Sequence, residues 1–150
     1  MIQTELLNIT IEFDWEEVGK ITLEGTSEIH VPKPLNEPAV YIIHSKIGRY
    51  IGETSDLRRR LQNYRRPGGS DKTEKPRTNR RIQRKIINAL ANHEVTVYKA
   101  VNLRSFKKGD QSLVVNLHKK HVRLFVENAI IMAMETQGDA DWNDPTITDV

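Results

Sequence analysis

Two short β-prone segments and a capped helix follow one another directly between residues 39 and 64, and this succession restricts the fold more than any other feature. Residues 39–44 (AVYIIH) and 49–52 (RYIG) are joined by a turn with a glycine near its tip, which predicts a β-hairpin. Thr54 or Ser55 can cap a helix through DLRRRLQNY, with Asp56 favourably placed in the first turn. A hairpin that leads into a helix predicts a mixed α/β domain.

One more strand and two more helices are predicted after this block. Residues 94–101 (EVTVYKAV) alternate like a strand, and apolar spacing predicts helices from residue 78 or 79 to about 92 and from about 119 to 136. We therefore expect an α/β fold over residues 39–150, with a small, mainly antiparallel β-sheet flanked by helices.

The first 38 residues are predicted to form a β-prone extension that packs on this core. Residues 7–13 and 20–24 alternate like strands and suggest a hairpin around Val18-Gly19, although residues 13–18 could instead form a helical turn. Three prolines then predict an extended linker through VPKPLNEP.

Basic residues are concentrated in the middle of the chain. The formal net charge is only +3, but residues 1–40 carry −6, residues 41–124 carry +15 and residues 125–150 carry −6. This concentration favours a polyanionic partner, although a solvated basic surface is the alternative. A helical projection places a cationic stripe opposite the apolar face of the helix near residues 78–92. The residues predicted to contact nucleic acid are Arg65, Arg66, Arg77, Arg80, Arg81, Arg84 and Lys85.

Composition excludes several classes of protein. There is no cysteine, which removes disulfides, Cys-ligated zinc and thiol catalysis and fits a cytoplasmic protein. The apolar stretches are too short to span a bilayer, so no membrane partner is expected. His118 and His121 are spaced like zinc ligands, but without a clear third ligand a place on the basic surface is the better interpretation.

Tyrosines on both hairpin strands and an arginine on the following helix resemble the GIY-YIG nuclease family. The matching segments are AVY (39–41), YIG (50–52) and TSDLRRRL (54–61), and later positions extend the resemblance to about residue 143. The first motif has alanine in place of glycine, its spacer to YIG is shorter than usual, and Glu53 stands where several members of the family have lysine.

The resemblance implies a role for each matched side chain. Tyr41 would orient or deprotonate the attacking water, with Tyr50 supporting it, and Arg60 would bind the phosphate oxygens as a bidentate fork. Tyr64 matches a position where the family often has His or Tyr near the site. Each residue also has a structural alternative. Tyr41 and Tyr50 could be ordinary aromatic residues of the strands, and Arg60 could be one more exposed arginine in the RRR run. Tyr64 could simply pack beside Leu61.

Glu127 is the strongest single candidate on local evidence. It is the only charge in LFVENAIIMAM (124–134), where a carboxylate needs a cation or hydrogen bonds. Mg²⁺ or Mn²⁺ would satisfy it, and the alternative is a structural ion pair with Arg123. Asn143 resembles a late asparagine of the family near the site, but WND could equally be a simple turn.

The resemblance thus implies a metal-dependent endonuclease that hydrolyses phosphodiester bonds in DNA, with DNA favoured over RNA. A recognition partner or a homodimer is left open. The competing interpretation is a catalytically weak or inactive GIY-YIG-like module that binds nucleic acid, and a third is a structural or protein-interaction domain.

Overall fold

A single antiparallel sheet organises the computed structural model, which describes residues 9–68, 74–107, 111–113, 115–135 and 141–143. Within these residues the sheet has six strands. Five of them are neighbours in the order β2-β1-β5-β3-β4, and the sixth, β6, pairs with β5. The strands are β1 (Ile9–Glu24), β2 (Glu28–His30), β3 (Ala39–Ser45), β4 (Gly48–Thr54), β5 (Val95–Lys107) and β6 (Gln111–Leu113). The helices are α1 (Leu57–Arg65), α2 (Glu74–Leu90) and α3 (Lys120–Glu135). The predicted α/β class with a mainly antiparallel sheet is confirmed.

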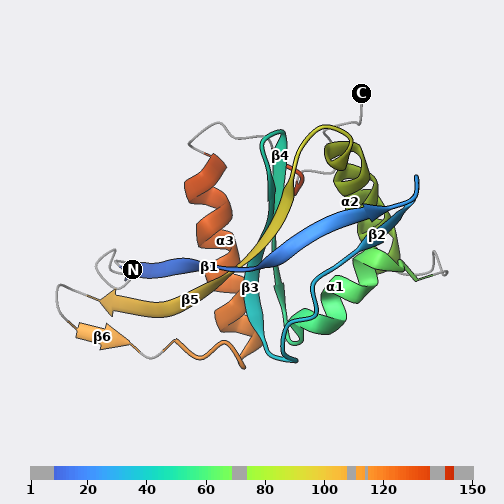
Figure 1. The fold of residues 1–150 in the computed structure, drawn as a ribbon. Coiled ribbons are helices and arrows are strands. Elements are labelled where there is room, and N and C mark those ends of the chain that lie inside the picture. Colours follow the sequence, from blue (N-terminus) through green and yellow to red (C-terminus); the bar gives the residue numbers. More distant parts are fainter. Residues whose placement is uncertain (1–8, 69–73, 108–110, 114, 136–140, 144–150) are drawn as a thin grey trace.

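Helices cover both faces of the sheet, as Figure 1 shows: α3 lies on one side, and α1 and α2 lie on the other. Successive side chains of a strand point to opposite faces, so β3 contributes to two cores. Tyr41 and Ile43 pack on the side of α1 and α2. Val40 and Ile42 pack on the side of α3. No helix among the described residues combines the length and the apolar character needed to span a bilayer.

The predicted β3–β4 hairpin is present, and its register explains the glycine of the YIG segment. Tyr41 lies opposite Gly52. A Cβ atom at Gly52 would lie only 2.5 Å from the Tyr41 hydroxyl oxygen. Glycine therefore leaves the space that this buried tyrosine side chain needs.

The N-terminal segment differs from its prediction. The expected hairpin around Val18-Gly19 is wrong, and so is the alternative helical turn, because β1 runs unbroken through these residues. The pairing of β1 with β5 shifts by one residue between Glu17 and Gly19, so the irregularity there is a β-bulge. The chain turns instead after Glu24, at Gly25, whose φ of +70° is a conformation that glycine adopts readily.

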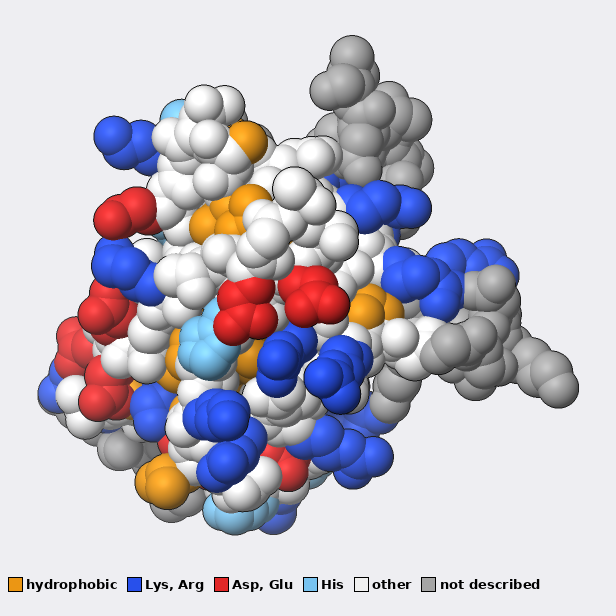
Figure 2. All heavy atoms as spheres, turned by 45° about the vertical axis from the view of Figure 1, so that its right-hand side comes forward, with side chains coloured by type: hydrophobic (Ala, Val, Ile, Leu, Met, Phe, Trp, Pro, Cys, Tyr) orange, Lys and Arg blue, Asp and Glu red, His pale blue; other side chains and the backbone are white. Residues whose placement is uncertain are grey.

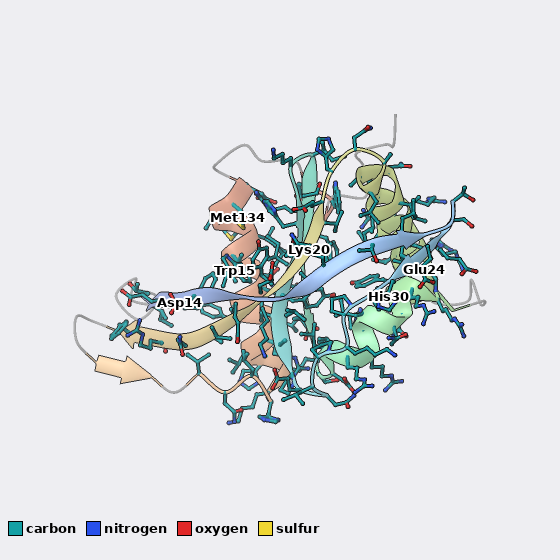
Figure 3. All side chains as sticks on the ribbon, viewed as in Figure 1. Asp14, Trp15, Lys20, Glu24, His30 and Met134 are labelled. Carbon is teal, nitrogen blue, oxygen red and sulfur yellow. The ribbon has the colours of Figure 1, made fainter. Side chains whose placement is uncertain are left out.

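β1 brings apolar side chains against α3. Trp15 of β1 and Met134 of α3 lie near each other in Figure 3 and line the same groove of about 370 Å³. The strands of the N-terminal segment are thus part of the sheet, while the domain boundary at residue 38 stays a prediction.

The second helix also begins earlier than expected. It starts at Glu74, before Pro76, rather than at residue 78 or 79. Proline is tolerated in the first turn of a helix because its missing N–H would have no partner there. Asn79 therefore lies inside α2 instead of capping it. Residues 69–73, between α1 and α2, lie outside the described residues.

Candidate active site

Three tyrosines from three elements converge beside the β3–β4 hairpin. The hydroxyls of Tyr41 (β3) and Tyr64 (α1) are 2.6 Å apart. The ring centroid of Tyr50 (β4) lies 6.4 Å from that of Tyr41 and 6.2 Å from that of Tyr64. Tyr41 and Tyr64 are fully buried, whereas Tyr50 is partly exposed. Tyr64 therefore packs in the core, and its hydroxyl also contacts that of Tyr41, so its role at the site stays a prediction.

Burial dominates the ionisation of these phenols. It raises the pKa of Tyr41 well above 10, with the neighbouring Tyr64 adding to the effect. It also raises the pKa of Tyr50, but the Arg60 guanidinium opposes that shift and the Glu127 carboxylate adds to it. Tyr50 is thus the partly exposed tyrosine that interacts electrostatically with both charged candidates.

Helix α1 brings Arg60 to the tyrosines. Its N-cap is Asp56, whose carboxylate accepts a hydrogen bond from the Arg59 backbone N–H at 3.1 Å. Arg58 and Arg59 are exposed, but Arg60 is half-buried. Burial lowers the pKa of Arg60, but Tyr41, Tyr64, Tyr50 and Glu53 outweigh it and the net pKa is raised. The guanidinium forms no hydrogen bond or ion pair within the described part of the chain, so its N–H groups are available to an anion.

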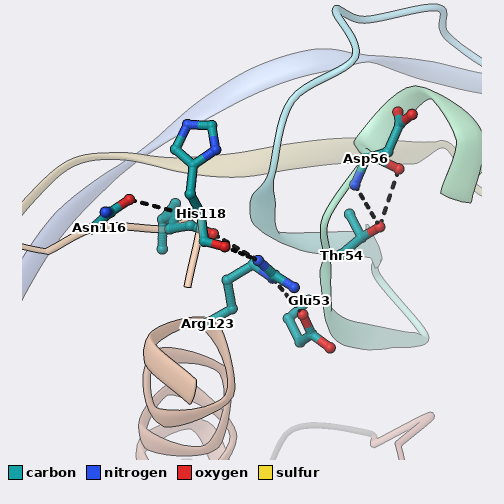
Figure 4. Close-up of polar contacts among 7 residues, drawn as sticks. Glu53, Thr54, Asp56, Asn116, His118 and Arg123 are labelled. Atoms are coloured by element: carbon teal, nitrogen blue, oxygen red, sulfur yellow. Dashed lines mark hydrogen bonds and ion pairs between the residues drawn. The ribbon is translucent and has the colours of Figure 1, made fainter. Parts of the chain in front are cut away.

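Glu53 and Arg123 form an ion pair on the α3 side of the sheet. The Arg123 Nε atom lies 2.7 Å from a carboxylate oxygen of Glu53, and both side chains are largely buried (Figure 4). One terminal nitrogen of Arg123 also donates to the backbone oxygens of Leu117 and His118. Arg123 therefore pairs with Glu53, and the alternative pairing with Glu127 is replaced by this contact. Sequence spacing could not reveal it, because the partners are 70 residues apart.

Glu127 lies near this ion pair. Arg123 is not among the groups that shift the pKa of the Glu127 carboxylate. Burial and the nearby charge of Glu53 raise its pKa to about 7, while the backbone amide of Glu53 and the charge of Arg60 oppose the rise. A half-buried carboxylate with a raised pKa favours a bound cation, and a carboxylate oxygen suits Mg²⁺ or Mn²⁺. The described residues include no group of three or more acidic or histidine side chains that could hold a metal. An ion at Glu127 would thus need water or phosphate oxygens as further ligands, as Mg²⁺ commonly has.

Asn143 holds the edge of β4. Its side-chain oxygen accepts from the Ile51 N–H at 2.9 Å, and its side-chain nitrogen donates to the Ile51 carbonyl at 2.6 Å. The Trp142 N–H donates to the Arg49 carbonyl, and the indole covers Gly48. Asn143 therefore lies next to Tyr50 along the strand edge, where its amide binds the backbone of β4.

The basic residues of α1 and α2 occupy one face of the molecule. Ile82, Ile86 and Ala89 form the buried face of α2, as predicted. Figure 2 shows Lys and Arg side chains gathered on the lower and right-hand part of the view. Arg80 and Arg81, which are among the predicted nucleic-acid contacts, also bind backbone carbonyls of the chain. Arg80 donates to the Gly68 carbonyl at 2.8 Å, and Arg81 donates to the Trp142 carbonyl at 2.5 Å. Among the others, Arg66, Arg77 and Arg84 are exposed and Arg65 and Lys85 are partly buried.

Comparisons with known proteins agree with this geometry. Residues 37–99 match the family model of the GIY-YIG catalytic domain. The structure of a mutant of bacteriophage T4 EndoII is similar, with a TM-score of 0.53 and 18% sequence identity, over 81% of this chain and 88% of that chain. No curated protein matches the sequence. The resemblance to the GIY-YIG nuclease family is therefore confirmed, and so is the fold.

Proposed function

We propose that this chain, which carries a GIY-YIG catalytic domain match, is a metal-dependent endonuclease that hydrolyses phosphodiester bonds in DNA. The proposal rests on the placement of Tyr50, Arg60 and Glu127: the Tyr50 ring packs against Tyr41 and Tyr64, and Arg60 and Glu127 lie close enough to shift its pKa in opposite directions. These three side chains supply a hydroxyl, a guanidinium and a carboxylate, which are the groups that water attack on a phosphodiester requires. GIY-YIG nucleases generally use divalent metal ions and act on DNA, which supports the same reaction.

Tyr50 is the residue that we assign to the attacking water. Its pKa is raised, mainly by burial, so at neutral pH the neutral hydroxyl would accept a hydrogen bond from the water and direct it. Tyr41 is fully buried and its hydroxyl contacts Tyr64. This placement favours the reverse of the assignment made from sequence, with Tyr41 supporting Tyr50.

Arg60 would bind the non-bridging oxygens of the scissile phosphate. A guanidinium presents two parallel N–H groups to a phosphate, which the single ammonium of a lysine does not reproduce. The guanidinium stays charged at neutral pH, and the nearby Glu53 carboxylate favours this charged form. Because the charge develops in a partly water-excluded site, its stabilising effect on the transition state is larger than it would be at the open surface.

Glu127 would hold the metal ion. The backbone amide of Glu53 and the charge of Arg60 both favour the ionised form of its carboxylate. A bound divalent ion would act as a Lewis acid toward the phosphate and the departing oxyanion. The basic face of α1 and α2 would contact the phosphodiester backbone, which positions DNA without reading its sequence.

A second candidate is a module of the same fold that binds nucleic acid with weak or no catalysis. One observation favours it: Glu53 adds a second carboxylate beside Glu127, and its charge is offset by Arg123 rather than by a substrate-facing cation. The charge of Glu53 also raises the pKa of Glu127, which disfavours the ionised carboxylate that a metal ion would need.

Cleavage and binding measured together separate the two candidates. If the chain is an endonuclease, wild-type protein should nick supercoiled plasmid DNA in Mg²⁺ or Mn²⁺. The cleavage should stop when EDTA removes the metal ion. Glu127→Ala should lose cleavage by at least about 100-fold while the dissociation constant for a DNA duplex changes little. Glu135→Ala, an exposed carboxylate at the end of the same helix, is the matched control. An inert wild type that still binds DNA would favour the second candidate.

A further inference from the structure

A polar cavity lies beside Arg60, at the junction of β4, α1 and α2. Its volume is about 190 Å³. The lining includes Thr54, Asp56, Arg59, Arg60, Asn63 and Asn79. Because Arg60 also interacts with the three tyrosines, the cavity adjoins the proposed catalytic site.

Asn79 is the unusual residue of this cavity. It lies three and seven residues before Ile82 and Ile86, so helical spacing places it on the buried face of α2. Only 5% of the residue is exposed, and its side-chain oxygen has no hydrogen-bond partner among the described residues. A buried amide oxygen without a partner is destabilising. Its position at the cavity points to a partner other than the described residues, such as a bound ligand.

The other polar groups indicate what that partner must carry. Arg59 and Arg60 are cations that only donate hydrogen bonds, whereas the Asp56 carboxylate accepts them, here from the Arg59 backbone and from Asn36. An ionised phosphate has no donor for the Asn79 oxygen and is repelled by Asp56. A ligand that is anionic at one end and bears both donors and acceptors at the other fits all of these groups. A nucleotide has this chemistry, with its phosphate toward the arginines and its base toward the amide.

We propose that this cavity holds the base of a nucleotide adjoining the phosphate bound by Arg60, and that Asn79 contacts the polar edge of that base. Asn79 is then a specificity-determining residue, because an amide can form two hydrogen bonds with one base and fewer with another. The inference rests on the proposed function only for the identity of the polymer. The cavity itself can be tested without cleavage.

The test is an NMR titration of the full chain with each of the four deoxynucleoside 5′-monophosphates and with 2-deoxyribose 5-phosphate, which lacks a base. At least one mononucleotide should bind 10-fold or more tightly than the baseless sugar phosphate and should shift the side-chain amide signals of Asn79. Asn79→Leu should remove this advantage, whereas Asn88→Leu, an exposed asparagine of the same helix, should keep it. Leucine removes an unpaired buried amide at similar size, so the variant is expected to fold, and its melting temperature verifies this. Asn79→Ala provides a second test of the same contact.

Every outcome either supports or overturns the proposed nucleotide site. Equal binding of all five ligands, or a base advantage that survives both Asn79 substitutions, would overturn the proposal. Base-dependent binding lost on substitution supports it, even if wild-type protein cuts no DNA. A wild-type protein that binds a nucleotide in this way but cuts no DNA would contradict the endonuclease proposal and still support the nucleotide site. If the protein does cut, the base preference next to the cut in a randomised duplex should weaken in Asn79→Leu.

Discussion

The hydroxyl of Tyr41 occupies the space that a side chain at Gly52 would need. Gly52→Ala would place a methyl group 2.5 Å from that oxygen, so we expect a loss of about 1–3 kcal/mol in the free energy of unfolding. In a Tyr41→Leu background, which vacates this space, the penalty of Gly52→Ala should fall by more than half. Urea denaturation of the four proteins measures both values. An equal penalty in the two backgrounds would show that the contact is not the cause.

The carboxylate of Glu127 carries a stability cost as well as a proposed function. Its pKa is raised from 4.5 to about 7, first by burial and then by Glu53. The unfolded chain therefore ionises Glu127 at a lower pH than the folded chain does. For this reason its contribution to stability falls as the pH rises from about 4.5 to about 7, and remains unfavourable above that.

Glu127→Gln should accordingly stabilise the metal-free protein at pH 8 and leave it almost unchanged at pH 4. Since the side chain is only half-buried, solvent screening keeps the gain on the order of 1 kcal/mol. Unfolding in EDTA at the two pH values measures it, with Glu135→Gln as the control. A variant no more stable than wild type at pH 8 would contradict the raised pKa of Glu127.

Elements formed by local signals were predictable, and those set by distant pairing were not. The β3–β4 hairpin and α1 follow from alternation, a glycine turn and a nearby capping residue, although the N-cap is Asp56 rather than Thr54 or Ser55. By contrast, β1 is one strand because it pairs along its length with β5, about 80 residues away. The same limit applies to the site. The motif selected Tyr41, Tyr50 and Arg60 as candidates, but the burial of Tyr41 and the unpaired side-chain oxygen of Asn79 depend on packing between elements.

The ion pair between Glu53 and Arg123 joins β4 to α3. Its contribution to stability therefore depends on the contact between these two elements. Arg123→Met leaves Glu53 largely buried and unpaired beside Glu127, so we expect a loss of about 3 kcal/mol in the free energy of unfolding. The double variant Glu53→Gln/Arg123→Met removes the unpaired charge and should recover more than half of that loss. Chemical denaturation at pH 8 compares the three proteins. A double variant as unstable as Arg123→Met would contradict this explanation.

Across the whole molecule, a modest net charge conceals a strongly basic central region between two acidic ends. If the face of α1 and α2 binds DNA, log K should fall linearly with log salt concentration, by about 0.9 for each phosphate neutralised. Arg84→Gln, at an exposed position of α2, should reduce that slope by about 0.9. Arg104→Gln, exposed on β5, serves as the control and should leave the slope unchanged. A salt-independent affinity for the wild type would argue against either nucleic-acid function.

The central claim is that Arg60 and Glu127 act on the same phosphodiester, and a double-mutant cycle of DNA cleavage tests it most directly. Single-turnover rate constants in Mg²⁺ would be measured for wild type, Arg60→Lys, Glu127→Gln and the double variant. We expect each single substitution to reduce the rate at least about 100-fold, and the double variant to lose much less than the product of the two, because residues of one catalytic unit are not additive. A wild type inert in both Mg²⁺ and Mn²⁺, or single variants that cleave at the wild-type rate, would contradict the claim.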